Sequence, residues 1–360
     1  MNKKVKYTIL MIGPGATDNI GGGVVTVIDN LMEIISKRFN IVRIITMRPT
    51  SFFYRLYIYL NAICSLIYQI LFTRSKKLAH VHMASKTSFY RKSLLIILLK
   101  SCNIPILVHL HGASYHIFYR NSGALMQKYI KWIFSITDKT ILLSDSWQEW
   151  YINAINTNQS SVIYNGVTDY YNNKSLALLK RQNEILFLGR IGERKGIYDL
   201  LHAFQKVVKV IPDAILKIGG DGEVDKAKDL TSKLNLSKNV EFLGWVNEEE
   251  KYKLLNNAKV YILPSYNEGL PMGLLEGMSA GLAVISTDVG GIPEVIENEK
   301  NGLLIKAGNK IQITNSLIKV LTNNQLLEEL GESARKSFLK SFNSKIMTNK
   351  VEEIYDEILK

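Results

Sequence analysis

The chain has 360 residues, of which 47% are hydrophobic and 21% charged. This composition excludes a disordered chain and a small disulfide-stapled protein, and the length suits two domains of ordinary size. The net charge of +13 is uneven: residues 1–180 hold 21 basic and 7 acidic residues, a net of +14, whereas the rest hold 24 and 25, a net of −1. Because no nucleic-acid-binding motif is present, the cationic half favours a phosphorylated ligand or an anionic membrane surface over nucleic acid.

Short apolar runs alternate with amphipathic stretches along the chain, which is typical of βα units in a parallel sheet. In the first half we predict strands at 7–12, 41–46, 79–83, 106–109, 140–143 and 162–164, with helices such as 23–37 and 88–101 between them. In the second half we predict strands at 185–188, 215–218, 240–242, 260–263, 283–286 and 302–305, with helices starting near Gly196, Glu223, Glu248, Pro271 and Asn309.

The predicted fold class is therefore α/β, with two doubly wound, Rossmann-like domains. We expect these domains to cover residues 1–168 and 174–341, joined by the polar stretch 165–174. A C-terminal helix at about 342–360 is expected to pack back on the first domain. Ligands of such sheets bind beyond the carboxyl ends of the strands, so two facing domains would form a binding cleft.

Features of the first half bear on cellular location. Cys64 and Cys102 stand in apolar sequence without metal-ligand spacing, which predicts buried free thiols in a reducing compartment. The opening MNKKVKYTILMIG is interpreted as a first strand and not as a signal peptide, because its apolar run is short and ends in glycine.

Between Arg55 and Arg74 lie 18 uncharged residues, near the lower limit for crossing a bilayer. A narrow polar stripe recurs at every fourth residue of this segment, at Asn61, Ser65, Gln69 and Thr73. The stripe favours a helix that packs in the domain or lies in the membrane interface, with a true span as the weaker alternative.

The first strand runs into a glycine-rich turn, GPGATDNIGGG. Glycines let a backbone approach a ligand closely, and the next helix N-terminus offers N–H groups to an anion. The dinucleotide fingerprint fails because Asp18 holds the third glycine position and no acidic residue ends the second strand. A purely structural turn is an equal alternative.

The segment VHLHG places two histidines at the end of a strand. We expect them on opposite faces, with His109 in the core and His111, in the loop before a glycine, in contact with a ligand. Chelation of a metal by both is then not expected, and a hydrogen-bonded structural role for His111 is the alternative.

In the second half, FLGRIGERKG follows a strand and opens a helix. Arg190 and Lys195 at that turn would be two cations able to hold a diphosphate. Further on, Pro271 suits the start of a helix whose second turn carries Glu276 among leucines, where a carboxylate needs a partner such as ribose hydroxyls. N–H groups near Met272 and Gly273 favour a phosphate.

These residues carry a resemblance. The spacing E268-x7-E276, preceded by PSxxEG and followed by GxxVISTDxGGxPE, resembles the donor-site signature of the family-4 retaining glycosyltransferases, which have the two-domain GT-B fold. GR-x4-KG, the HG after the fourth strand, the glycine loop and NGV at 165–167 match in the same order. HVHMAS and SFYRKS resemble the branch that builds bacterial polysaccharides.

The resemblance implies roles for individual residues. Arg190 and Lys195 match the pair that neutralises the departing nucleotide diphosphate. Glu268 matches the carboxylate that contacts the transferred sugar, Glu276 the one that binds the ribose, and His111 the histidine close to the reacting carbon. Further donor-binding residues are implied at the glycine loop, at the base-binding loop and around the second carboxylate: Gly21, Gly22, Gly23, Trp245, Val246, Leu270, Met272 and Gly273.

Three departures from the family pattern stand in this chain. Leu270-Pro271 replaces a frequent Phe-Gly, which removes one N–H donor. Thr168 follows NGV where an Asp is frequent. No Asp-x-Asp is present, in keeping with the metal-independent chemistry of the family.

Together these observations predict a retaining, metal-independent glycosyltransferase without a cofactor. It would move a sugar from a nucleotide-diphosphate sugar, UDP-linked in preference to GDP-linked, to a hydroxyl of a lipid-linked glycan. We expect a cytoplasmic protein, peripheral on the inner face of the cell membrane. The alternatives are a non-catalytic subunit of the same fold and a nicotinamide-dependent enzyme.

Overall fold

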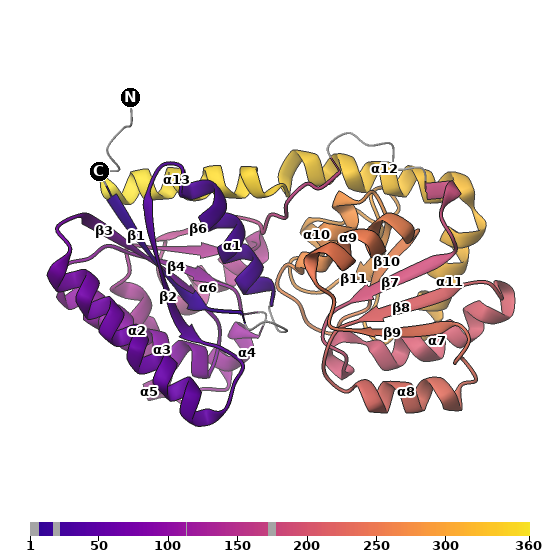
Figure 1. Cartoon of the computed structure of the whole chain (residues 1–360), viewed down its shortest axis with the longest axis horizontal. Coiled ribbons are helices and arrows are strands. Elements are labelled where there is room, and N and C mark those ends of the chain that lie inside the picture. The colour runs from indigo at the N-terminus through magenta and orange to yellow at the C-terminus, as the bar shows by residue number, and fades with distance from the viewer. Residues whose placement is uncertain (1–6, 17–21, 113, 172–177) are drawn as a thin grey trace. The chain divides into compact units, whose positions relative to one another are not determined.

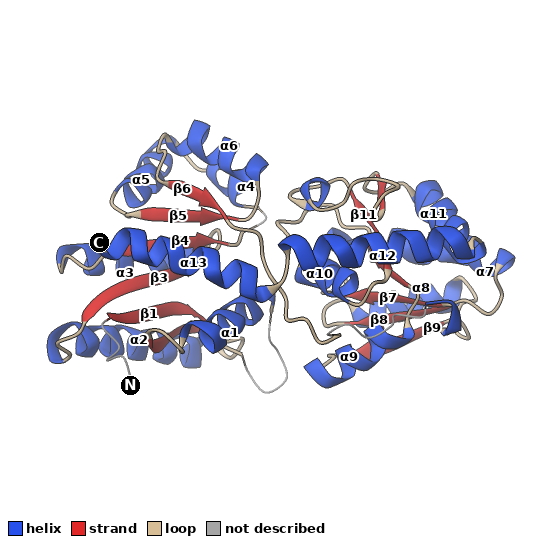
Figure 2. Cartoon of the chain, turned by 90° about the horizontal axis from the view of Figure 1, so that it is seen from above, coloured by secondary structure: helices blue, strands red, loops and turns tan. Residues whose placement is uncertain are grey.

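The computed structural model describes residues 7–16, 22–112, 114–171 and 178–360. The chain forms two compact units, one of residues 1–166 with 344–360 and one of residues 167–343 (Figure 1). Each contains a six-stranded parallel sheet with helices on its faces (Figure 2). The predicted α/β class with two doubly wound sheets is confirmed. The sequence placed the domain ends at 168, 174 and about 342, and the structure divides the chain at 166/167 and 343/344.

In the first unit the strand order is β2-β1-β3-β4-β5-β6. The strands are β1 (Tyr7–Pro14), β2 (Asn40–Met47), β3 (Lys76–Met83), β4 (Ile106–Leu110), β5 (Lys139–Leu142) and β6 (Ser160–Val162). The helices are α1 (Gly23–Ile35), α2 (Phe52–Phe72), α3 (Thr87–Ser101), α4 (Tyr115–Arg120), α5 (Ala124–Ser135), α6 (Asp145–Ile155) and α13 (Ser344–Leu359). β6 begins two residues earlier than the predicted 162.

One face of this sheet packs on α2, α3, α5 and α6 through a continuous apolar core. The other face packs on α1 and α13. The C-terminal helix is fixed there by polar contacts: the Tyr355 hydroxyl lies 2.6 Å from His80 Nδ1, and Arg38 donates to Asp356 at 2.6 Å. Strands buried on both faces explain why β1 and β4 read as unbroken apolar runs in the sequence.

In the second unit the strand order is β12-β11-β10-β7-β8-β9. The strands are β7 (Glu184–Leu188), β8 (Ile215–Gly219), β9 (Val240–Gly244), β10 (Val260–Leu263), β11 (Ala283–Thr287) and β12 (Leu303–Ile305). The helices are α7 (Ile197–Val210), α8 (Val224–Lys233), α9 (Glu248–Asn257), α10 (Met272–Ser279), α11 (Lys310–Thr322) and α12 (Asn324–Ser341), with short 3-10 turns η1 (Leu178–Lys180), η2 (Glu193–Lys195) and η3 (Ile292–Glu294).

The uncharged segment between Arg55 and Arg74 lies within α2, which is long and apolar enough to cross a membrane by length and composition alone. It is held against the core by Ile58, Ala62 and Leu66, which recur every fourth residue. Only 17% of its most apolar window is buried, so most of the helix lies on the surface of its unit.

The expectation of buried thiols is wrong. Both cysteines are free and exposed. Cys64 lies on the outer side of α2, away from the residues that reach the core, and Cys102 caps the C-terminus of α3. Apolar neighbours in the sequence do not indicate burial of Cys64, because the exposed side of α2 is also apolar.

Candidate functional site

The carboxyl edge of the second sheet gathers most of the predicted donor-site residues. β7 and β10 are neighbours and run parallel, so Arg190 after β7 and Glu268 after β10 emerge at the same edge. β8 pairs with the other side of β7. Ligands of open α/β sheets bind at this edge, and the loops that follow β7, β8, β9 and β10 all lie there.

Lys195 and Glu268 form the tightest contact at this edge. The Lys195 Nζ donates to Glu268 Oε1 at 2.5 Å, and Arg194 Nη1 lies 3.8 Å from the same oxygen. The side chains of Lys195 and Glu268 are only 13% and 7% exposed. A carboxylate so buried requires a cation or hydrogen-bond donors, and Lys195 supplies both. The family resemblance implies separate roles for these two residues; the structure shows them as a pair.

The main chain holds this pair in place through two glycines. Gly196 ends the turn of Lys195 with a φ of +71°, and a Cβ there would lie 2.0 Å from the Pro264 carbonyl oxygen. Gly290 has a φ of +58°, and a Cβ there would lie 1.9 Å from the Glu268 carbonyl oxygen. Both positions need glycine for conformation and for space. The loops after β7, β10 and β11 therefore touch through backbone atoms.

Arg190 differs from Lys195 in being exposed and unpaired. Among the described residues no carboxylate lies within ion-pair distance of its guanidinium. Its stem rests on the next loop, since a Cβ at Gly222 would lie 3.2 Å from Arg190 Cγ. The Lys195 side chain lies beside the main chain of Gly189, the residue before Arg190, since its Cε would lie 3.6 Å from a Cβ at Gly189. An exposed guanidinium and a lysine that follow the same strand suit a diphosphate.

Glu276 has a partner that the sequence analysis missed. Lys251 of α9 donates to Glu276 Oε1 at 2.7 Å and to Glu248 Oε1 at 2.7 Å. Burial lowers the pKa of Lys251, but the two carboxylates outweigh it, so this pKa lies above its ordinary value. The predicted need of Glu276 for a partner is met by Lys251, which leaves the second carboxylate oxygen for a ligand. The spacing of Glu248 and Lys251 in α9 indicates their own ion pair, but nothing in the sequence indicates the contact of Lys251 with Glu276.

The start of α10 provides the predicted N–H groups. Pro271 is its N-cap, Met272 and Gly273 are its first residues, and Leu270 before them is 4% exposed. A Cβ at Gly273 would lie 2.2 Å from the Tyr261 hydroxyl, so only glycine fits there. Backbone N–H groups and the helix dipole favour an anion at this terminus.

Trp245 and Val246 follow β9 at the same edge. Trp245 is 42% exposed, and Val246 Cγ2 would lie 2.7 Å from a Cβ at Gly219, the last residue of β8. Val246 thus covers the end of β8 while the indole stays in solvent. An exposed indole at such an edge can stack on a flat ring.

The glycine loop belongs to the first unit and is only partly described. Gly21 lies outside the described residues. Gly22 is the N-cap of α1 and Gly23 its first residue; a Cβ at Gly22 would meet no atom of the described residues within 4 Å. A Cβ at Gly13 would lie 2.4 Å from Ile28 Cδ1. Gly13 is therefore required for packing, whereas no described neighbour restricts Gly22.

His109 and His111 lie on the same side of the sheet, and the expectation of opposite faces is wrong. Their rings stack with centroids 4.1 Å apart, because residues two apart in a strand share a face. His109 is buried, as expected. His111, directly after β4, is partly exposed, and its Nε2 lies 2.8 Å from His82 Nδ1. The alternative given above, a hydrogen-bonded structural histidine, therefore holds for the Nε2 atom of His111.

In the first unit, four histidines form a stack at the carboxyl ends of β3 and β4: His80, His82, His109 and His111. Burial lowers the pKa of His109 to about 3 and holds the pKa values of the other three well below their ordinary value. The stack is uncharged at neutral pH.

The same cluster brings ring nitrogens of His80, His82 and His109 within 4.8 Å of one another. The interplanar angles are 23° for His80–His82, 9° for His80–His109 and 32° for His82–His109. Nitrogen lone pairs lie in the ring plane, so those of nearly parallel rings do not converge on one point. This arrangement fits stacked imidazoles better than a tetrahedral metal site.

Lys92 of α3 is a buried cation at the same end of the first sheet. It is 2% exposed, and its Nζ donates to Ser88 Oγ at 2.9 Å. No carboxylate lies within ion-pair distance of it among the described residues. Burial, helped by the charge of Arg91, lowers the pKa of Lys92 to about 7.

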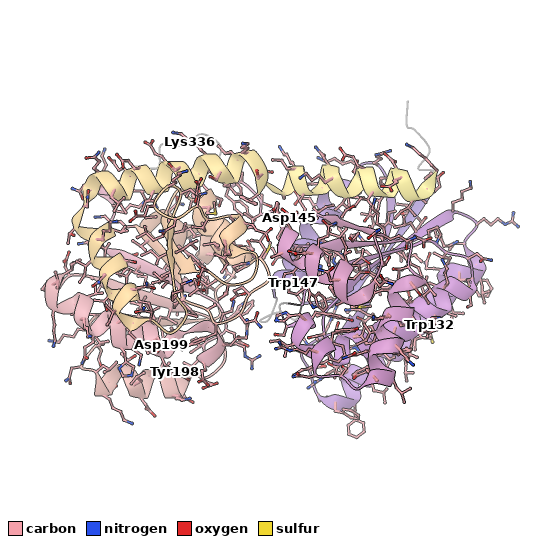
Figure 3. All side chains as sticks on the ribbon, turned by 180° about the vertical axis from the view of Figure 1, so that it is seen from behind. Trp132, Asp145, Trp147, Tyr198, Asp199 and Lys336 are labelled. Atoms are coloured by element: carbon pink, nitrogen blue, oxygen red, sulfur yellow. The ribbon has the colours of Figure 1, made fainter. Side chains whose placement is uncertain are left out.

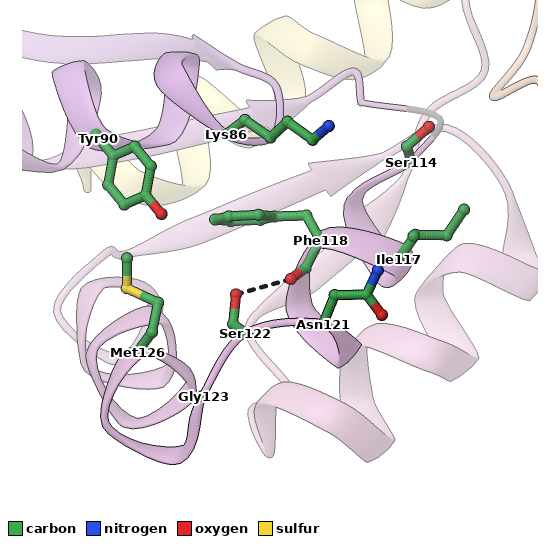
Figure 4. A pocket seen from close by; sticks show the side chains of 9 residues that line it. All are labelled: Lys86, Tyr90, Ser114, Ile117, Phe118, Asn121, Ser122, Gly123 and Met126. Atoms are coloured by element: carbon green, nitrogen blue, oxygen red, sulfur yellow. Dashed lines mark hydrogen bonds between the residues drawn. The ribbon is translucent and has the colours of Figure 1, made fainter.

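A pocket of about 470 Å³ opens in the first unit between the start of α3, α4 and the start of α5 (Figure 4). Its wall combines one cation, several hydroxyl and amide groups and an apolar floor: Lys86, Tyr90, Ser114, Ile117, Phe118, Asn121, Ser122, Gly123 and Met126. Such a lining can bind a polar group at the rim and apolar surface beneath it.

The chain is similar to known glycosyltransferases. Residues 172–337 match the family described as "Glycosyl transferases group 1". The chain is 27% identical over 312 residues to the UDP-Gal:alpha-D-GlcNAc-diphosphoundecaprenol alpha-1,3-galactosyltransferase of Escherichia coli, covering 81% of this chain and 78% of that enzyme. It is 26% identical to the capsular polysaccharide biosynthesis glycosyltransferase CapM of Staphylococcus aureus, over 51% of this chain and 48% of CapM.

Among solved structures, the crystal structure of Anabaena HepE in complex with UDP and glucose superposes with a TM-score of 0.76 at 15% identity, over 97% of this chain and 99% of that one. This likeness concerns the fold. The segment 172–337 is therefore similar to the group 1 glycosyltransferases, and the chain as a whole has the GT-B fold.

Proposed function

We propose that this chain is a group 1 glycosyltransferase that transfers a sugar from a nucleotide-diphosphate sugar to a hydroxyl of a lipid-linked glycan, with retention of the anomeric configuration and without a metal ion. The observation that carries the proposal is the edge of the second sheet. There, in the described part of the chain, the exposed Arg190 has no ion-pair partner, Lys195 and Glu268 form a buried pair, and α10 begins without a side-chain cap.

Each part of this edge suits one part of a nucleotide sugar. Arg190 and Lys195 would bind the diphosphate together with the N–H groups of Met272 and Gly273, and would stabilise the charge that grows as it leaves. Glu268, fixed by Lys195, would accept hydrogen bonds from the transferred sugar. Trp245 would contact the base.

Glu276 would hold the ribose. Lys251 occupies its Oε1, so the free oxygen would accept from ribose hydroxyls. The UDP named with HepE and the UDP-galactose named with the E. coli enzyme support a UDP-sugar as the donor.

The first unit would bind the acceptor. The partly exposed His111 would contact the sugar near the reacting carbon, and the pocket from Lys86 to Met126 would select the acceptor. The lipid diphosphate acceptor named for the E. coli relative supports an acceptor of that class.

A panel of UDP-sugars, GDP-sugars and NAD, each added in a thermal-shift measurement, tests the donor. We expect one UDP-sugar to raise the melting temperature and NAD to leave it unchanged. An equal shift with NAD would overturn the proposal.

Transfer of that labelled sugar to a lipid diphosphate acceptor, with and without EDTA, tests the reaction, and NMR of the product gives its anomeric configuration. Arg190→Ala and Glu268→Ala serve as inactive controls. A wild-type protein that binds the donor but is as inert as these variants would indicate a non-catalytic subunit.

A further inference from the structure

The outer side of α2 is an exposed apolar surface. Large side chains recur along it at helical spacing with 38–81% of their area exposed: Phe53, Leu56, Tyr57, Leu60, Ile67, Tyr68 and Leu71. We call this surface the α2 face. Leaving so many large apolar groups in water is unfavourable, and contiguous patches of this kind mark interaction sites.

The helix lies along its unit and does not cross a bilayer. It connects β2 to β3, which both pair with β1 in the same direction, so the chain must return along one face of the sheet. Ile58, Ala62 and Leu66 anchor it to the core, and the Tyr59 hydroxyl donates to the Arg91 carbonyl oxygen at 2.7 Å. A partner must therefore meet the α2 face from the side.

Neighbouring helices continue this surface. Helices α2, α3 and α5 lie together on the side of the sheet opposite α13 (Figure 1). Tyr90 and Leu94 of α3 are 45% and 57% exposed, and Trp132 of α5, labelled in Figure 3, is 46% exposed. Tyrosine and tryptophan side chains favour the headgroup region of a bilayer, because each combines an apolar ring with a polar group.

The charge around the face has one sign. From residue 34 to residue 137 the sequence contains 15 Lys and Arg and no Asp or Glu. Arg55 lies near one end of α2 and Arg74 just beyond the other, both exposed, and Lys128 and Lys131 of α5 are exposed as well. A segment that includes α2, α3, α4 and α5 thus carries positive charge without compensation by its own residues.

This charge discriminates between possible partners. A second copy of the chain meeting the same face would place cation against cation, which opposes association. An anionic lipid surface offers phosphates to the cations and acyl chains to the apolar residues. We propose that the α2 face docks on an anionic lipid bilayer, with α2 parallel to the membrane plane. The proposal does not depend on the transferase activity.

Co-sedimentation of the full chain with vesicles tests it. We expect binding to vesicles of phosphatidylglycerol and phosphatidylcholine, weaker binding to phosphatidylcholine alone, and weaker binding at 1 M than at about 0.1 M salt because the charges are screened. Equal binding to both vesicle types, or binding to neither, would overturn the proposal.

A triple variant, Phe53→Gln with Leu60→Gln and Leu71→Gln, removes apolar side chains that are 81%, 52% and 67% exposed. It should reduce vesicle partitioning by about tenfold or more, since each lost apolar side chain weakens insertion. The matched control is Val210→Gln with Ile311→Gln and Leu339→Gln, three exposed apolar residues of the second unit, which should bind as the wild type does.

Sedimentation velocity without lipid tests whether a second copy of the chain, and not a lipid surface, binds the α2 face. We expect the wild type and the triple variant to sediment alike. A wild-type dimer that the triple variant abolishes would assign the α2 face to a second copy and overturn the lipid proposal, as would a well-folded triple variant that binds vesicles as tightly as the wild type.

Discussion

The buried ionisable side chains at the carboxyl edge of the second sheet are paired with opposite charges: Lys195 with Glu268 and Lys251 with Glu276. At the same edge of the first sheet, ionisable side chains are buried without an opposite charge, and their pKa values move towards the neutral form, as for Lys92 and His109. Charge is therefore retained where a charged leaving group is expected and suppressed where an uncharged hydroxyl is expected. The predictions below test this contrast.

The largest effect is expected for the charge of Glu268. Glu268→Gln keeps the shape and a hydrogen bond to Lys195 but removes the negative charge that fixes the ammonium. We expect the sugar-transfer rate to fall by roughly 10²–10³, the range seen when one electrostatic contact to a transition state is lost. The exposed Glu297→Gln in the same unit is the control. Unchanged turnover in a folded Glu268→Gln protein would remove Glu268 from the site.

Lys92 should destabilise the first unit in a pH-dependent way. Below pH 7 Lys92 is protonated in both the folded and the unfolded chain, so burial of its charge lowers the free energy of unfolding by its full amount. Between pH 7 and its ordinary 10.5 only the unfolded state holds the proton, so stability rises with pH, by about 1.4 kcal/mol per pH unit.

Lys92→Met removes that charge and should therefore raise the melting temperature more at pH 6 than at pH 10. Lys100→Met, an exposed lysine of the same helix, should show no such difference. A Lys92→Met gain that is the same at both pH values would show that the lysine is not neutralised on folding.

The histidine stack predicts a pH dependence of the same sign at acid pH. Between pH 6.5 and about 3 the unfolded chain binds a proton at His109 that the native chain does not, so stability falls as pH falls, by about 1.4 kcal/mol per pH unit for this residue. His109→Phe, of similar shape, should flatten the pH dependence of the unfolding free energy by that amount. It should also be tolerated at pH 7, because neither ring nitrogen of His109 has a hydrogen-bond partner among the described residues. An unchanged slope would mean that His109 is protonated in the native state.

The smallest effect is expected for Lys251, which orients Glu276 without touching the donor. Lys251→Met should raise the Kd of the nucleotide sugar about tenfold, equivalent to about 1.4 kcal/mol, and leave kcat nearly unchanged, because the ribose is remote from the reacting bond. Lys253→Met, which removes an exposed pair with Glu249, should change neither constant. A loss confined to kcat would contradict the orienting role.

Much of the fold could be predicted because the central strands of both sheets, such as β1, β4, β10 and β11, are buried on both faces. Their apolar runs are short and end at glycine or polar residues, so the predicted 260–263 coincides with β10 and the other strands differ at their ends. Buried parallel strands and the glycines that follow them constrain the sequence strongly. The predicted site residues of the second unit lie at one edge for the same reason, since each follows a strand of the same sheet.

The wrong or missing predictions concern residues whose burial or contacts the local sequence pattern does not indicate. Cys64 has apolar neighbours, but they belong to an exposed helix face. The partnership of Lys251 with Glu276 joins residues 25 apart, and no local spacing encodes it. Stacking of His80 on His109 depends on the register of β3 against β4, which only the folded sheet defines.

The loop that carries Glu268 rests directly on the backbone of Gly290. Its position is set by a residue 22 places further along the chain that has no functional group to offer. A library randomised at this codon and selected for sugar transfer should return glycine almost alone, although position 290 would never contact the donor. Engineering of donor preference should accordingly leave this turn untouched and vary Trp245, whose exposed ring is free of such steric constraint.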